Sequence, residues 1–323
     1  MFRSRRSREL AAQGVGALLL VLVAAVLVTT LAGNLARLNL TAGFGFLLRP
    51  AGMRIGESLV AFEPTDSFLW AMVAAGVNTV RVSLAAIVLA TVLGTAVGVM
   101  RLGSNPLLRG ITGVYVEVFR NTPLLLQILF WSAVLLKLPG IRDAVDFWGW
   151  AFLSNRGLQL PTVVFSDGIA MQFPVRRLFG FQGGMALTPE FCALLLGLVA
   201  YSGTFIAEIV RAGILAVPGG QWEAARSLGL RDGTIMRRIV LPQALRVIVP
   251  SLTSQYVGIV KNSSLAIAIG FPDLFWAVST AINVTGHAVE GVAVLMVGYL
   301  VLTLGTSGAM GVWYSRLMRA GGR

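Results

Sequence analysis

The sequence has few charged residues, a single cysteine and a single histidine. Charged side chains make up 12% of its 323 residues, whereas hydrophobic side chains make up 56%. A soluble domain carries about twice that charged fraction. One water-soluble core cannot enclose so much apolar surface, so the composition predicts a membrane protein with several spans.

The scarcity of cysteine and histidine removes several chemistries. A lone cysteine, Cys192, excludes a disulfide or a cysteine zinc site within the chain, and its apolar neighbours predict a packing role. The lone histidine, His287, is expected near the end of a span rather than in a catalytic site. The chain also lacks a Gly-x4-Gly-Lys-Ser/Thr phosphate loop, so any ATP hydrolysis must come from a partner. We therefore expect a chain that is not an enzyme and that binds no cofactor or metal itself.

Basic residues outnumber acidic ones, 26 against 14, which gives a formal net charge of +12. On a soluble chain this balance would suggest nucleic acid. Here the basic residues flank apolar runs, so they indicate the positive-inside bias of membrane proteins and attraction to anionic lipids.

The apolar runs predict about six membrane-spanning helices with both termini in the cytoplasm. The first run follows four arginines and is too long for a cleaved signal peptide, so we expect it to be retained. The expected spans are about 14–35, 70–100, 111–136, 190–217, 244–269 and 291–314. Segments 36–68 and 137–188 are expected outside, the second with some local structure, and 101–109 and 218–242 inside.

The expected organisation is one membrane domain without a linker. Residues 1–69 comprise a cytoplasmic tail, the first helix and an external loop, residues 70–318 form the membrane domain, and residues 319–323 are a cytoplasmic tail. The spacing of Gly94 and Gly98 in the second span would let another helix approach closely.

Charged residues within spans need a reason, since each costs about 2.5–3.5 kcal/mol on insertion scales. Glu117 and Arg120, like Glu208 and Arg211, have the i,i+3 spacing of an ion pair. In a continuous third helix, Gln127 would lie on the same stripe as Glu117 and Arg120, although Pro123 interrupts the backbone bonding there. The alternatives are helix anchoring or a polar pathway and inner gate.

A second group, Lys261 and Asn262, lies in the fifth span with no acid nearby in the sequence. The lysine must find a partner on another helix or face a cavity, which favours a pathway or gate. Asn78 and Thr79, in the outer part of the second span, are weaker candidates for the same role.

The sharpest pattern lies in the expected cytoplasmic segment 218–242. It reads Glu223-Ala224-Ala225, then Gly229, and after nine further residues Ile239-x-Leu241-Pro242. We expect two short helices: Pro218 starts the first, Gly229 ends it in the left-handed conformation, and Asp232 caps the next turn. Such a segment suits docking on another protein, although an ordinary amphipathic connector remains an alternative.

This spacing resembles the signature of permease subunits of binding-protein-dependent ABC importers. Three further segments, 119–127, 201–211 and 260–265, are similar to those of polar amino acid permeases, and together the matches cover about residues 70–318. The N-terminal helix and the 137–188 segment resemble the general L-amino acid permeases of the family. The resemblance implies an all-α, type I ABC importer permease fold, a five-helix core plus the N-terminal helix.

The resemblance also implies the partners and the location. A second permease, homologous or identical, two ATPase subunits that bind ATP and Mg²⁺, and an external amino-acid-binding protein would complete a transporter in the bacterial inner membrane. Glu223, Ala224, Ala225, Gly229, Leu241 and Pro242 would couple the chain to the ATPase. The residues expected along the translocation pathway or gate are Glu117, Arg120, Gln127, Glu208, Lys261 and Asn262.

Two rival functions remain at this point. An intramembrane enzyme would need a nucleophile and a base at one depth, and His287 has no such partner in the sequence. A secondary transporter would show internal repeats with broken helices in matching halves, which the sequence does not display.

Overall fold

The computed structural model describes residues 43–164, 170–177 and 180–320, together with residues 9, 13–23, 25–26, 29–30 and 33. Residues Gln13–Val23 form a helix within the predicted first span. The basic residues that precede this helix, from Arg3 to Arg8, and the last residue, Arg323, lie outside the described residues.

Three long apolar helices form the frame of the molecule: α2 (Phe68–Met100), α5 (Pro189–Leu215) and α10 (Ala288–Ala320). In the described part of the chain, they are the helices long and apolar enough to cross a membrane unaided. Ser67 and Thr188 cap α2 and α5 by accepting hydrogen bonds from the backbone N–H groups of Trp70 and Phe191. These helices confirm the second, fourth and sixth predicted helical segments.

The predicted third helix, 111–136, is wrong as a continuous helix. The chain forms α3 (Pro106–Asn121) and α4 (Leu124–Leu136), which meet at an angle of 104°. Pro123 has no N–H to donate and adopts an extended backbone conformation, which ends the first helix. The side-chain amide of Gln127 donates to the carbonyls of Phe119 at 2.8 Å and Thr122 at 3.0 Å, so carbonyls freed by the break keep partners.

The predicted fifth helix is also followed by a break. α8 (Leu241–Asn262) tightens into the 3-10 helix η4 (Ser263–Ile269), and the left-handed Gly270 ends it. After Asp273 comes a helix that the sequence did not predict, α9 (Leu274–Thr285), at 50° to the preceding segment. If each bent pair crosses the membrane once, the described helices make up to five spans, and the number six stays a prediction.

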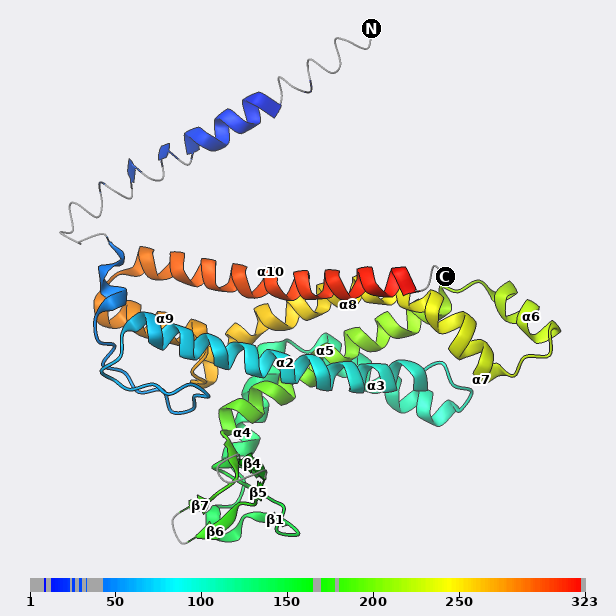
Figure 1. The fold of residues 1–323 in the computed structure, drawn as a ribbon, viewed down its shortest axis with the longest axis horizontal. Coiled ribbons are helices and arrows are strands. Elements are labelled where there is room, and N and C mark those ends of the chain that lie inside the picture. Colours follow the sequence, from blue (N-terminus) through cyan, green and yellow to red (C-terminus); the bar gives the residue numbers. More distant parts are fainter. Residues whose placement is uncertain are drawn as a thin grey trace.

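The prediction of an all-α fold is wrong for the segment between α4 and α5. After the 3-10 turn η2 (Ile141–Asp143), antiparallel strands form a four-stranded sheet in the order β1-β2-β3-β8 and two hairpins, β4–β5 and β6–β7. The strands are Val145–Phe147, Ala151–Ser154, Gly157–Leu160, Thr162–Val164, Ala170–Gln172, Val175–Arg177, Gly180–Gln182 and Met185–Leu187. Figure 1 shows this β unit beyond the far end of α4, projecting away from the long helices.

Part of the predicted external loop 36–68 packs on the helices. The 3-10 helix η1 (Phe44–Leu48) places Phe46 in a core with Phe68 of α2 and Leu274 of α9. The ring of His287 stacks on Phe46, with centroids 4.8 Å apart. This loop therefore joins the beginning of α2 to α9 and to the turn that precedes α10.

The close helix approach expected at Gly94 and Gly98 is confirmed between α2 and α5. A Cβ atom added to Gly94 would lie 2.6 Å from the Cβ of Ile206, and one added to Gly98 would lie 2.6 Å from the carbonyl oxygen of Ala207. Real Cβ atoms do not approach so closely. Glycine therefore permits the α2–α5 contact, which matters in a bilayer because small residues, rather than hydrophobicity, let helices associate.

Candidate functional site

A short exposed helix, α6 (Gly219–Ser227), occupies the connection between α5 and α8. Gly229 follows it with φ of 74°. The N–H of Gly229 donates to the carbonyl of Arg226 at 2.9 Å, and that of Leu230 donates to the carbonyl of Ala225 at 3.2 Å. This pair of bonds is the Schellman arrangement that ends a helix, so the predicted left-handed role of Gly229 is confirmed.

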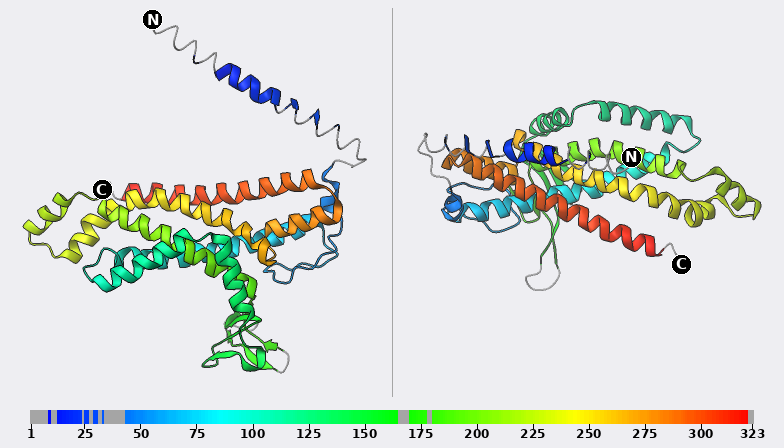
Figure 2. Two further views of the ribbon diagram at one scale, coloured as in Figure 1. Left: turned by 180° about the vertical axis from the view of Figure 1, so that it is seen from behind. Right: turned by 90° about the horizontal axis from the view of Figure 1, so that it is seen from above.

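Helix α6 has one inward and one outward side. Ala225 is buried in the main hydrophobic cluster, against which Trp222 also packs. Glu223, Ala224 and Leu228 are exposed, and Leu228 keeps 79% of its surface accessible. Figures 1 and 2 show α6 at the end of the molecule where α10 also ends. The segment therefore offers a carboxylate, small residues and one large apolar side chain for contact from outside.

The predicted cap at Asp232 is wrong. The N-cap of the next helix, α7 (Asp232–Ile235), is Arg231, and it makes no side-chain cap hydrogen bond. The carboxylate of Asp232 instead accepts from Nε of Arg226 at 3.0 Å. This hydrogen bond and the negative charge raise the pKa of Arg226 above its ordinary value. The pair joins α6 to α7 across the turn at Gly229.

The chain returns to the membrane helices through a π-helical turn, η3 (Met236–Val240). Leu241 and Pro242 form the beginning of α8, as predicted, and both are exposed. Ile235 and Val240 are buried in the same cluster as Ala225. Because one core holds both halves of the segment, a force on α6 can reach α8 directly.

Close to the end of α5, Glu208 binds two arginines. Its Oε2 lies 3.0 Å from Nη2 of Arg211, and it also pairs with Arg101, which follows the last residue of α2. The expected Glu208–Arg211 pair is therefore present. The sequence analysis missed Arg101, although its position after an uncharged run marked it as a cation at a span end. The cluster lies about two turns before the end of α5 and links that helix to α2.

The expected ion pair between Glu117 and Arg120 is absent from the described residues. Both side chains are exposed, and Arg120 lies over the ring of Phe205 on α5, 5.0 Å from its centroid. The predicted polar stripe with Gln127 is wrong, because the break at Pro123 turns α4 away from α3. Buried Gln127 bonds to the backbone across that break.

Lys261 and Asn262 form the last turn of α8. Lys261 lies about 30 Å along the helix from Leu241, at about 1.5 Å per residue. It is therefore far from the α6 segment, whereas the Glu208 cluster is near it. The Lys261 side chain is exposed and lines a cavity, and Asn262 is half-buried.

A further polar cluster, absent from the sequence-based candidates, joins the loop that precedes α2 to three helices. The carboxylate of Glu57 binds Nη1 of Arg81 at 2.5 Å and accepts from the hydroxyl of Thr188 at 2.5 Å. Asn78 donates to the carbonyls of Glu57 at 2.6 Å and Pro272 at 3.0 Å. The hydroxyl of Thr79 accepts from the N–H of Leu274 at 3.0 Å. Asn78 and Thr79 thus hold α2 to α9. The sequence feature that could have revealed this cluster is Arg81, a charged residue within α2.

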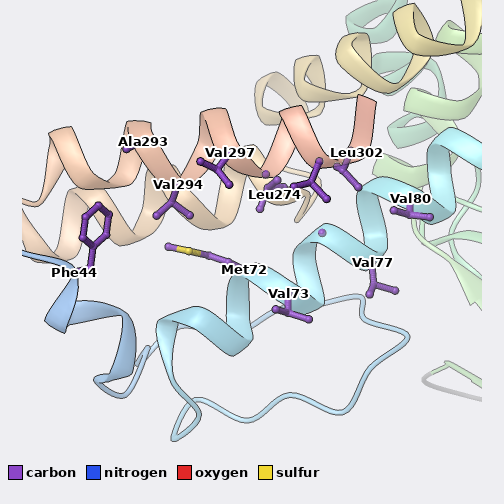
Figure 3. Close-up of a pocket in the computed structure, with 13 residues that line it drawn as sticks. Phe44, Met72, Val73, Val77, Val80, Leu274, Ala293, Val294, Val297 and Leu302 are labelled. Atoms are coloured by element: carbon purple, nitrogen blue, oxygen red, sulfur yellow. The ribbon is translucent and has the colours of Figure 1, made fainter. Parts of the chain in front are cut away.

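A wide groove of about 590 Å³ separates α2 from α10 beside Phe44 (Figure 3). Figure 3 shows Met72 of α2 reaching into the space below Val294 and Val297 of α10, and Val73, Val77 and Leu302 also line the groove. All thirteen lining residues are apolar. A groove without a polar side chain suits lipid chains or another helix and offers nothing to bind a charged solute.

Comparison with known proteins places these features in context. Residues 86–319 match the family model described as binding-protein-dependent transport system inner membrane component. The chain is 41% identical to the putative amino-acid ABC transporter permease protein YhdX of Escherichia coli (strain K12), over 88% of this chain and 87% of that protein. It is 38% identical to the general L-amino acid transport system permease protein AapQ of Rhizobium johnstonii, over 88% and 86%.

A solved structure shares the fold. The crystal structure of an amino acid ABC transporter with histidines matches with a TM-score of 0.57 and 26% identity, over 77% of this chain and 95% of that one.

Proposed function

The chain belongs to the binding-protein-dependent transport system inner membrane components, and we propose that it is the membrane-spanning subunit of an ATP-driven amino acid importer. Relatives named as amino-acid permeases span nearly its whole length. The observation that carries the proposal within the molecule is α6, an exposed helix between two membrane helices that shares their core.

In this proposal α6 and the beginning of α8 receive the ATPase subunit. Glu223, Ala224 and Leu228 face outward, Gly229 sets the end of the helix, and Leu241 and Pro242 remain accessible beside it. Ala225 anchors the helix to the core that also holds Ile235 and Val240. Movement of an ATPase bound here is transmitted to α5 and α8, because they are packed in that same core.

The complete transporter in this proposal contains a second permease, two ATPase subunits and an external amino-acid-binding protein. ATP and Mg²⁺ bind to the ATPase subunits, and this chain binds no cofactor. The chain lies in the bacterial inner membrane with six spans, and the α6 segment and both termini face the cytoplasm. The family membership and the apolar helices support the multi-span membrane location.

The proposed route for amino acids uses the polar residues within the spans. Glu117 and Arg120 are exposed without an ion pair to each other in the described structure, which leaves them available to line a route between two permeases. Glu208 is held by two arginines, which suits a gate that opens when those pairs rearrange. Gln127 and Asn262 would support the route by shaping the backbone breaks next to it.

The test is to express the chain with its neighbouring permease, ATPase and binding protein, isolate the complex through this chain, and reconstitute it in proteoliposomes. We expect the ATPase subunits to co-purify with this chain. Radiolabelled amino acids should cross the vesicle membrane only when ATP is present on the side of the ATPase subunits and the binding protein is present on the opposite side. Uptake driven by an ion gradient without ATPase subunits would identify a secondary transporter instead. Loss of uptake in a catalytically dead ATPase variant is the matched control.

A further inference from the structure

The groove beside Phe44 continues along α10 (Figure 3). A second cavity, of about 420 Å³, lies next to it and shares three lining residues with it, Val80, Val301 and Leu302. Together the two cavities follow α10 from Ala293 to Met310, which is about 26 Å at 1.5 Å per residue. The hydrocarbon core of a bilayer is about 30 Å thick. The groove is therefore nearly as long as the membrane-embedded part of a helix.

The walls of this groove suit a helix. Small residues line it on both sides, which lets the backbone of another helix approach closely. They are Gly76, Ala293, Gly298, Gly305 and Ala309. A Cβ atom added to Gly76 or Gly305 would meet nothing within 4 Å, so the described residues leave this space open. Of the three long helices, α10 is also the least covered: 11% of its apolar stretch is buried, compared with 56% for α5.

The chain is fixed at one end of the groove just before η1. The N–H of Gly43 donates to Oε1 of Glu290, in the first turn of α10, at 2.8 Å. The next residue, Phe44, lines the groove. The predicted first span ends at about residue 35, eight residues before Gly43, and eight residues reach at most about 28 Å. The first helix is therefore tethered within reach of the beginning of α10.

The helix Gln13–Val23 has no packing partner among the described residues. The consecutive side chains from Leu18 to Val23 are exposed, and six consecutive residues point to all sides of a helix. Helical residues are described as far as Gly33, and a helix over residues 13–33 would extend about 30 Å. Its length therefore matches the groove. The arginines before it place its beginning in the cytoplasm, so it would run antiparallel to α10.

We propose that the chain's own first helix fills the groove between α2 and α10. A helix attached at Gly43 binds intramolecularly, at a high effective concentration, which favours it over a lipid chain or a helix of the second permease. In this position it covers the open side of α10 and places its backbone against the glycines of the groove. The proposal requires the membrane location but not the transport of amino acids, so a transport assay that failed would leave it standing.

The test is disulfide formation in the full chain, assembled with its partner subunits in nanodiscs. Aligning residue 35 with Ala288 places Leu22 beside Val301, since each lies thirteen residues from that end. Single cysteines at each of residues 18–26 are therefore combined with Val301→Cys, and oxidation is followed on non-reducing gels. A disulfide needs Cβ atoms about 3.5–4.5 Å apart. We expect bonds at positions three or four residues apart, because one face of the first helix meets the groove.

Leu300→Cys is the matched control. Leu300 lies at the same depth as Val301 and is exposed, but it lines a different cavity and neither part of the groove. Its bonds with residues 18–26 should be severalfold weaker than those of Val301→Cys. Equal yields for the two positions would mean that the first helix has no fixed place, and the proposal would fail. Cys192 is buried, and Val301→Cys alone controls for bonds to it.

A protease site inserted between α4 and α5 identifies the occupant. A bond within one chain holds the two fragments together until it is reduced, which is the expected result. A product of twice the chain's mass would show instead that the first helix of a second copy fills the groove. No bond at any position in an assembled complex would assign the groove to lipid or to another protein. Either of these results overturns the proposal.

A second measurement needs one cysteine and applies if the double variants do not assemble. Cysteines at Val21, Leu22 and Val23 in turn are labelled with a lipid-soluble maleimide. Gly76→Leu fills part of the groove, so it should displace the helix and raise the labelling rate severalfold at one or more of these positions. Gly311→Leu, on α10 outside the groove and with nothing within 4 Å of an added Cβ, should not. Rates unchanged by Gly76→Leu at all three positions overturn the proposal.

Discussion

Replacing Gly229 tests whether the end of α6 sets the contact with an ATPase. The residue has φ of 74°, and a Cβ atom added there would meet nothing within 4 Å. The cost of a side chain within this chain is therefore conformational rather than steric. A non-glycine residue in the left-handed region costs about 1–2 kcal/mol, whereas asparagine tolerates it better.

If the αL turn must be in place for docking, that cost is subtracted from the binding free energy of the ATPase. We expect Gly229→Val to weaken ATPase binding about five- to thirtyfold, which corresponds to about 1–2 kcal/mol, and Gly229→Asn to weaken it only a few-fold. Substrate-stimulated ATP hydrolysis at limiting ATPase concentration should fall in the same order. Membrane insertion and expression should not change.

The measurement is the dissociation constant of purified ATPase subunits for nanodisc-embedded permease, by interferometry. Gly233→Ala is the matched control, because Gly233 lies in α7 without a positive φ and an added Cβ meets nothing within 4 Å. Equal affinities for Gly229→Val and the wild type would refute the reasoning. Equal losses in the valine, asparagine and Gly233→Ala variants would show a general sensitivity of the segment rather than a need for the left-handed turn.

Three further predictions follow from the membrane helices. A reporter fused after residue 165 should be active outside the cell membrane and one fused after residue 232 inside, and the reverse pattern would invalidate the assigned orientation. In thermal unfolding, Gly98→Leu should lower the unfolding free energy of the permease by about 1–3 kcal/mol, because the larger side chain separates α2 from α5. Gly308→Leu should be tolerated, because a Cβ atom added to Gly308 meets nothing within 4 Å. Glu208→Gln should lower the unfolding free energy by about 1–2 kcal/mol, a figure reduced to allow for the partial solvent exposure of the ion pairs. The double variant Glu208→Gln with Arg211→Gln should recover part of that loss. No recovery would show that the arginines do not depend on this carboxylate.

The sequence identified the features that depend on short-range pattern. Long apolar runs predicted α2, α5 and α10, since a bilayer demands about twenty apolar residues in one helix. Gly94 and Gly98 predicted a close helix contact because small residues at a spacing of four lie on one face. Gly229 predicted a helix end because glycine alone adopts the left-handed conformation without cost.

Features that depend on contacts between distant residues were mispredicted or missed. The strands between α4 and α5 are short, three or four residues each, so their alternation was too brief to stand out from a loop. The sequence placed Pro123 within a helix, but local spacing could not give the 104° between α3 and α4 or the hydrogen bonds that Gln127 makes across the break. Arg101 and Asp232 likewise found partners that local spacing did not suggest.

The amino-acid sequence by itself therefore determined that this chain crosses the membrane several times, and it predicted that segment 218–242 serves as a docking site for a partner. These properties follow from composition and local spacing. Only the tertiary structure decided which charges are neutralised: Glu208 is shared by two arginines, Asp273 is held behind Tyr299, and Lys261 faces a cavity without an acid among the described residues. The physical reason is that the cost of a charge in a membrane depends on the few side chains that reach it from other helices, and their identity is set by packing rather than by sequence distance.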